Sequence, residues 1–168
     1  MNVNHGYVHS AKETDWVPGI FELARTARAA GYLTVVVTNQ AGIARGLYSE
    51  AEFLDYTAWV HSQFRDQRAP LAATYYCPHH PDAGVGEWLR GCDCRKPAPG
   101  MLRAAADELV LDLDASVLIG DQPSDIQAAE AACMGRAWLF SGQRDGLSAF
   151  GRRLAMQAAA APRQEPRQ

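Results

Sequence analysis

Three cysteines and one histidine fall in two tight pairs, in the runs Cys77-Pro78-His79 and Cys92-Asp93-Cys94. In each pair one residue separates two soft ligands, so both side chains can point into one turn. Three thiolates and an imidazole form a complete tetrahedral set for zinc, and a site in which the protein fills every position is structural rather than catalytic. His80 is an alternative ligand to His79, and the competing interpretation is a set of reduced thiols beside a surface histidine.

Two cations, Arg95 and Lys96, follow the second pair directly, and Pro97 comes next. A metal that closes the loop would hold both cations rigidly beside it. An arginine fork binds phosphate through two parallel hydrogen bonds, and a lysine offsets the charge that develops on a transferring phosphoryl group. Most lysines are solvated surface residues, but the position of Lys96 beside the ligand pair favours a phosphate site.

The elements that must position these side chains alternate between strand and helix. Short β-branched or apolar runs predict strands over residues 33–37, 72–76, 116–120 and 137–140. Helical spacing and capping signals predict helices over residues 20–30, 49–68, 99–109 and 124–132. Ser49 with Glu52 three residues later is a capping box at the start of one of them. This alternation predicts an α/β fold with a mainly parallel sheet and flanking helices.

Polar residues stand where three of these strands end, and ligands of parallel sheets bind beyond the carboxyl ends of the strands. Thr38 and Asn39 follow the first strand and offer a hydroxyl, an amide and backbone N–H groups to a phosphate, although an ordinary polar loop over residues 38–46 is the alternative. Cys77 follows the second strand. Asp121 follows the third and suits Mg²⁺, while Asp125 either caps the next helix or orients Asp121.

Composition bounds the class of protein. The chain has 168 residues, 48% of them hydrophobic and 21% charged, with a net charge of -3. This balance disfavours a general binder of nucleic acid or membrane surfaces, and the residues after the metal ligands include no basic helix of a zinc-ribbon nucleic-acid binder. No apolar run reaches the length of a membrane span, so the cytoplasm is expected, where clustered cysteines indicate metal rather than disulfide. We expect one domain over residues 1–150, a tail over 151–168 that is disordered at its end, and a monomer.

Four stretches taken together resemble a known family. They are residues 36–46 (VVTNQAGIARG), 75–81 (YYCPHHP), 92–97 (CDCRKP) and the pair Gly120-Asp121. They resemble the haloacid-dehalogenase superfamily, and more narrowly the subgroup of heptose-1,7-bisphosphate 7-phosphatases and histidinol phosphatases. The resemblance covers residues 3–140, and its zinc loop is specific to this subgroup. It implies a Rossmann-like fold, Mg²⁺-dependent hydrolysis of a phosphate ester and a structural Zn²⁺.

The resemblance also implies roles for particular residues. Thr38 and Lys96 would stabilise the phosphoryl group, Asp121 would bind Mg²⁺, and Arg95 would help to recognise the substrate. The zinc ligands would be Cys77, His79, Cys92 and Cys94. The substrate pocket would be lined by Asn4, His5, Gly6, Tyr7, Thr38, Asn39, Gln40 and Ala41, together with Arg95 and Lys96.

One part of the family pattern is absent. The family begins with a buried strand that ends in Asp-x-Asp-Gly-Thr, whose first aspartate is the nucleophile and whose second is the general acid/base. Residues 1–9 match the stretch just after that motif, and Asp112-Leu113-Asp114 lacks the glycine. The missing strand normally lies between those that end at Thr38 and at Asp121, so we expect unpaired backbone edges there. We hypothesise that the start codon is placed too late.

The function expected is therefore a Mg²⁺-dependent phosphatase whose small phosphorylated substrate is heptose 1,7-bisphosphate and whose aspartate nucleophile is missing here. Arg95 beside Lys96 favours a second anionic group and hence a bisphosphate. Histidinol phosphate is an alternative substrate. A catalytically inactive module that binds zinc or phosphate is the alternative from another functional class.

Overall fold

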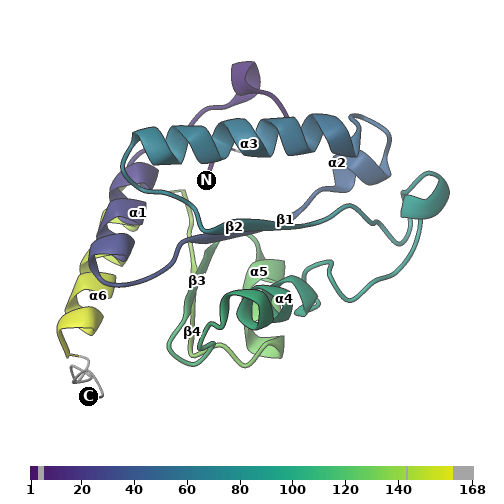
Figure 1. Ribbon diagram of the computed structural model, residues 1–168. Coiled ribbons are helices and arrows are strands. Elements are labelled where there is room, and N and C mark those ends of the chain that lie inside the picture. Colours follow the sequence, from purple (N-terminus) through teal and green to yellow (C-terminus); the bar gives the residue numbers. More distant parts are fainter. Residues whose placement is uncertain (4–5, 143, 161–168) are drawn as a thin grey trace.

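The computed structural model describes residues 1–3, 6–142 and 144–160, so Asn4 and His5 lie outside the described residues. In this part of the chain the strands are β1 (Val35–Asn39), β2 (Ala73–Cys77), β3 (Val117–Gly120) and β4 (Arg136–Leu139). The helices are α1 (Ile20–Ala29), α2 (Ala41–Ala44), α3 (Glu50–Asp66), α4 (Gly100–Leu109), α5 (Pro123–Ala131) and α6 (Arg144–Ala160), with the 3-10 turns η1 (Ala11–Glu13) and η2 (Gly86–Trp88). Figure 1 shows their arrangement.

The strands form two separate parallel pairs. β1 pairs with β2 from Val35 opposite Ala73 to Asn39 opposite Cys77, and β3 pairs with β4. The parallel α/β architecture is confirmed, but within the described residues no ladder joins β1 to β3. This is why β1 is half-buried along its length rather than buried on both faces. Val37 nevertheless packs against the same cluster as Leu118, so the two pairs share one core.

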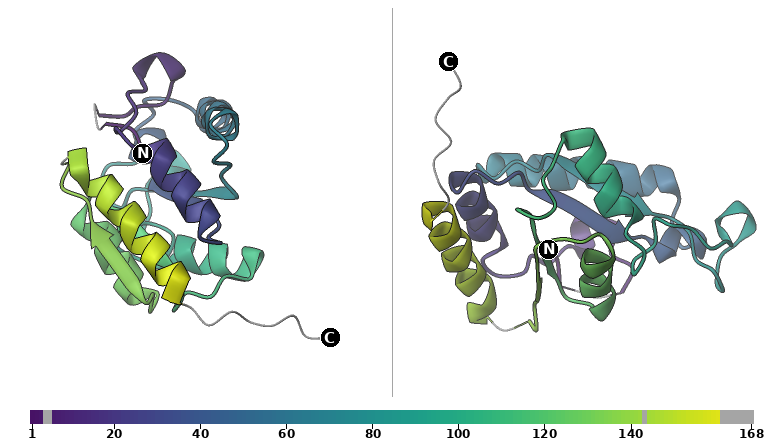
Figure 2. Two further views of the ribbon diagram at one scale, coloured as in Figure 1. Left: turned by 90° about the vertical axis from the view of Figure 1, so that its left-hand side faces the viewer. Right: turned by 90° about the horizontal axis from the view of Figure 1, so that it is seen from below.

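Helices cover both sides of the strands (Figures 1 and 2). On one side α1 and α6 pack against β3 and β4, and α1 and α3 pack against Val36 of β1. On the other side Leu102 of α4 and Ala128 of α5 pack against Leu118. At their carboxyl ends, β1 ends at Asn39, β2 ends at Cys77, and β3 ends at Gly120, the residue before Asp121. The segment between β2 and α4, drawn in teal, projects from this body in Figure 1.

Two predictions about element bounds need correction. The segment that follows β1 is not all loop, because Ala41–Ala44 forms one helical turn, α2. The expected domain boundary after residue 150 falls inside α6, where Leu154 is buried in the core against α1. Alanine and arginine dominate this part of the sequence and give little apolar periodicity, so the helix was not predicted. The expected disorder over residues 161–168 lies outside the described residues.

The capping box at the start of α3 gives a test of local stability. The Glu52 N–H donates to Ser49 Oγ at 3.2 Å, and the Ser49 N–H donates to Glu52 Oε2 at 2.7 Å. Ser49→Ala should lower the free energy of unfolding by about 1 kcal/mol, because it leaves a helix N–H without its acceptor. Urea denaturation followed by circular dichroism measures this change.

Ser62→Ala is the matched control, because the Ser62 hydroxyl donates within α3 to the Trp59 carbonyl and caps no helix end. It should change the free energy of unfolding by less than about 0.5 kcal/mol. Equal losses in the two variants would show that the capping box contributes nothing particular.

Candidate functional site

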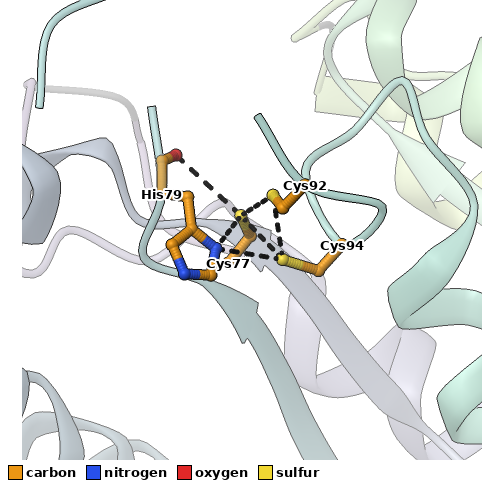
Figure 3. A group of neighbouring side chains, drawn as sticks. All are labelled: Cys77, His79, Cys92 and Cys94. Carbon is orange, nitrogen blue, oxygen red and sulfur yellow. Dashed lines mark hydrogen bonds between the residues drawn. The ribbon is translucent and has the colours of Figure 1, made fainter. Parts of the chain in front are cut away.

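The four predicted metal ligands meet at one point (Figure 3). The three sulfurs lie 3.1–3.4 Å apart, and His79 Nδ1 lies 3.4 Å from Cys94 Sγ and 3.7 Å from Cys77 Sγ. Zinc bonded to sulfur at about 2.3 Å would place sulfurs about 3.8 Å apart at the corners of a tetrahedron. Because the donor atoms all lie within 4.8 Å of one another, the set needs only a small expansion to close on zinc.

His79 rather than His80 completes this set. His80 Nδ1 accepts hydrogen bonds from the backbone N–H groups of Asp82 and Ala83, at 3.2 and 3.1 Å, and so serves the turn that follows. The Arg90 guanidinium lies 2.7 Å from His79 Nε2, and Nδ1 is the ring nitrogen that faces the sulfurs. Burial, aided by the Arg90 charge, lowers the pKa of His79 and favours the neutral imidazole that a metal requires.

Cys77 is the buried cysteine of the cluster, and burial raises the pKa of its thiol. A metal ion would have to displace this proton, because the thiolate is the form that binds zinc. Arg95 donates from Nη1 to the His79 carbonyl at 3.1 Å. The predicted substrate-binding arginine is thus tied by its side chain to the ligand loop.

Lys96 is not a solvated lysine. Its Nζ donates to the Val37 carbonyl at 2.8 Å and pairs with Asp125 Oδ1 at 2.6 Å, and its side chain is only 11% exposed. Its backbone forms a reciprocal pair with Asn39, in which the Lys96 N–H donates to Oδ1 and Nδ2 donates to the Lys96 carbonyl, both at 3.0 Å. Two of its three ammonium hydrogens are therefore taken, and one remains for a ligand.

Asp125 joins Lys96 to the end of β3. Its Oδ2 accepts from the backbone N–H groups of Asp121 and Gln122 at 3.1 and 3.0 Å, so it caps α5 while its Oδ1 pairs with Lys96. A β-carbon at Gly120 would collide with the Asp125 side chain, so this close approach requires glycine. Asp121 stays exposed beside it. The interpretation of Asp125 as a helix cap is therefore confirmed, and its ion pair with Lys96 is a feature that sequence spacing could not indicate.

The first residue of the chain lies near Lys96, Asp121 and Asp125, whose charges act on its amino group. Burial lowers the pKa of the Met1 amino group, Asp121 and Asp125 partly oppose this shift, and the Lys96 charge adds to it. Asn2 forms a bridge with Trp16 that fixes this segment. Farther on, Gly6 adopts a φ of +95°, and the Arg45 guanidinium lies 5.9 Å from the centroid of the Tyr7 ring.

The predicted loop residues after β1 are held by one another. Gln40 Nε2 donates to Thr38 Oγ1 at 2.9 Å, and the Tyr48 hydroxyl donates to Gln40 Oε1 at 2.6 Å. Ala41 is the first residue of α2. Tyr48 was not predicted from the sequence, because a tyrosine before a helix cap carries no signal of a role at a site ten residues upstream.

A cleft of about 580 Å³ opens beside this network, between η2 and the connection from α2 to α3. Aromatic, aliphatic and acidic side chains line it, including Tyr48, Trp88, Leu47, Val85, Glu50 and Glu87. It offers room for the non-phosphate part of a small ligand. In the part of the chain that the structure describes, no helix is long and apolar enough to cross a membrane.

The metal cluster gives a direct test. Purified protein should contain about one zinc ion per chain, and Cys94→Ser should abolish zinc retention and lower the melting temperature, because three ligands remain and the loop from β2 to α4 loses its closure. Inductively coupled plasma mass spectrometry and thermal unfolding measure the two effects. Cys133→Ser is the matched control, because Cys133 is exposed and lies outside the cluster; zinc retained by the Cys94 variant would contradict the assignment.

Comparisons with known proteins agree with this architecture. A family model described as "HAD-hyrolase-like" matches residues 93–150. The D-glycero-beta-D-manno-heptose-1,7-bisphosphate 7-phosphatase of Vibrio cholerae is 46% identical over 135 residues, which are 80% of this chain and 73% of that protein. The enzyme of the same name from Escherichia coli K12 is also 46% identical over 135 residues, covering 80% of this chain and 71% of that protein.

Solved structures show the same relationship. A protein of Mesorhizobium loti named as a HAD-like phosphatase superimposes with a TM-score of 0.83 at 30% identity, over 99% of this chain and 84% of that one. The D,D-heptose 1,7-bisphosphate phosphatase of B. bronchiseptica, crystallised with magnesium and phosphate, gives a TM-score of 0.77 at 29% identity over 93% of each chain. The chain therefore belongs to the HAD-like hydrolases and, within them, to the family of D-glycero-beta-D-manno-heptose-1,7-bisphosphate 7-phosphatases, which are phosphoric monoester hydrolases.

Proposed function

We propose that this chain provides the phosphate-binding and metal-binding part of a Mg²⁺-dependent phosphatase that hydrolyses heptose 1,7-bisphosphate. The observation that carries the proposal is the meeting of Lys96, Asn39 and Asp125 at the carboxyl ends of β1 and β3. This position is where ligands of parallel α/β folds bind. A cation with one free donor, held rigidly there, suits the charge of a transferring phosphoryl group.

Each residue of the site has a role in this proposal. Lys96 and the Thr38 hydroxyl contact the phosphoryl oxygens and stabilise the negative charge that builds up on them. Asp121 fits Mg²⁺, which binds through one or two carboxylates and the substrate phosphate and would neutralise charge on that phosphate. Asp125 holds Lys96 and the start of α5 in place. The zinc cluster holds the loop that presents Arg95.

The attacking group in this proposal is a carboxylate on a further strand between β1 and β3. Two observations support it. No Asp-x-Asp-Gly motif occurs in the sequence, and within the described residues no backbone ladder joins β1 to β3. The carboxylate would attack phosphorus and break its bond to the sugar oxygen, which takes up a proton and leaves as a hydroxyl group. Water would then hydrolyse the aspartyl phosphate to inorganic phosphate and the free carboxylate.

The relatives' names support a heptose bisphosphate as substrate. In this proposal the cleft beside Tyr48 and Trp88 receives the sugar body, and Arg95 reads the second phosphate. Reduced thiolate ligands and a small phosphorylated substrate suit a cytoplasmic enzyme, and we propose that it acts as a monomer. An inactive module that binds zinc or phosphate remains the alternative outcome of the activity test.

The activity test compares two proteins on heptose 1,7-bisphosphate with Mg²⁺. One is the 168-residue chain, and the other is extended upstream through the next in-frame start. Released phosphate should appear only with the extended protein, because a carboxylate nucleophile is needed for attack. Zinc content and circular dichroism confirm that both are folded. Turnover by the 168-residue chain would show that the nucleophile has been misplaced, and no turnover by either folded protein would favour the binding module.

Arg95 gives a test of substrate choice. In the extended protein, Arg95→Ala should reduce the preference for the bisphosphate over a sugar monophosphate, because an arginine fork binds a second phosphate bidentately. The ratio of kcat/KM for the two substrates measures this preference. Arg103→Ala is the control, since Arg103 is exposed on α4 and its guanidinium donates to the Ala131 carbonyl at 3.0 Å. An unchanged ratio in the Arg95 variant would overturn the role of Arg95.

A further inference from the structure

Tyr48 is an uncharged residue in a buried position next to the proposed phosphate site. It follows Thr38 by ten residues in the sequence. Its side chain is 6% exposed. The ring lies against Gly42, where any β-carbon would collide with it. On another side the His9 ring stacks on it, with centroids 4.4 Å apart and planes inclined by 11°. This packing fixes where the hydroxyl group lies.

In its hydrogen bond with Gln40, the Tyr48 hydroxyl is the donor. Its oxygen lies 2.6 Å from Gln40 Oε1, a carbonyl oxygen that can only accept, so the hydroxyl hydrogen is used in this bond. Burial raises the pKa of Tyr48 to about 12, so the hydroxyl keeps its proton at neutral pH and remains a donor. A tyrosine that donates must face the oxygen of an amide and not its nitrogen.

The orientation of the Gln40 amide follows from this. With Oε1 held by Tyr48, Nε2 faces Thr38 and donates to Oγ1 at 2.9 Å. The Gln40 backbone is also fixed, because its N–H donates to the Cys77 carbonyl at 2.8 Å. Thr38 Oγ1 thus accepts from Gln40, and its own hydrogen must point elsewhere. Within residues 1–3, 6–142 and 144–160 no acceptor takes this hydrogen.

We propose that Tyr48 is a positioning residue whose hydroxyl fixes the Gln40 amide, so that the Thr38 hydroxyl donates its hydrogen to a phosphoryl oxygen. If the amide turned over, Gln40 Oε1 would accept from Thr38, and the hydroxyl would be lost to the ligand. The inference rests on the proposed function for the identity of the acceptor. It adds a residue that touches neither the phosphate nor the metal.

A double-mutant cycle tests this relay with inorganic phosphate as the probe, in the presence of Mg²⁺. Tyr48→Phe keeps the ring and its packing and removes only the hydroxyl. It should weaken phosphate binding about three- to tenfold, the effect of losing one oriented hydrogen bond. In a Thr38→Val background the same change should weaken binding less than about twofold, because the hydrogen that Tyr48 orients is already gone. Isothermal titration calorimetry measures all four dissociation constants.

Tyr75→Phe is the matched control. It also removes a tyrosine hydroxyl bonded to a side chain, Glu108, at 2.7 Å, but it has no hydrogen-bonded connection to Thr38. It should leave phosphate binding unchanged. A second measurement is independent of the ligand: the side-chain NH2 resonances of Gln40 should shift and exchange faster in Tyr48→Phe and not in Tyr75→Phe.

The outcomes separate the relay from the proposed function. Equal weakening of phosphate binding by Tyr48→Phe in both backgrounds would overturn the relay, because Tyr48 would then act without Thr38. The relay would also be overturned if Thr38→Val weakened phosphate binding and Tyr48→Phe left it unchanged. A folded wild-type chain that binds no phosphate would overturn the proposed function, and the relay's role with it. Weakening in the wild-type background alone supports the relay.

Discussion

The structure depends on the ion pair between Lys96 and Asp125. It is nearly buried, and each partner is also held by backbone groups: Lys96 by the Val37 carbonyl and Asp125 by the N–H groups that open α5. Removing one partner of a buried pair typically costs about 3–5 kcal/mol, because the other charge stays buried without compensation. Here the pair also joins β1 to β3, which share no backbone ladder within the described residues.

The metal loop delivers Lys96 to this position. Cys94 stands two residues before Lys96, so closing the four ligands on an ion would fix the chain direction just before the lysine. Arg95 adds a second tether from its guanidinium to the His79 carbonyl. The loop ends when the Gly100 N–H donates to the Asp93 carbonyl at 2.8 Å, and α4 begins. The Cys/His cluster and the phosphate site that we propose are therefore held by the same loop, although a metal in the cluster would take no part in the proposed chemistry.

Sequence patterns predicted most of this arrangement. The ligand pairs could be recognised because metal coordination demands particular residue types at short spacing, and strand ends could be placed because β-branched runs are local signals. The contacts that connect distant segments were not predictable in this way. Lys96 and Asp125 are 29 residues apart in the sequence. The Tyr48 hydroxyl reaches Gln40 because α2, which lies between them, reverses the direction of the chain. α6 was not predicted because its alanine-rich sequence shows little apolar periodicity, although in the structure one face of it packs against α1 in the core.

In the site that we propose, Lys96 is held by Asp125 and binds the phosphoryl group. Titration of inorganic phosphate with Mg²⁺, followed by ³¹P NMR, tests it on wild type, Lys96→Met and Lys12→Met. These are the two lysines of the chain, and Lys12 lies exposed in η1, away from the site. We expect Lys12→Met to bind phosphate as wild type does. Lys96→Met, still folded by circular dichroism, should bind phosphate at least about tenfold more weakly. Undiminished phosphate binding by a folded Lys96→Met protein would contradict it.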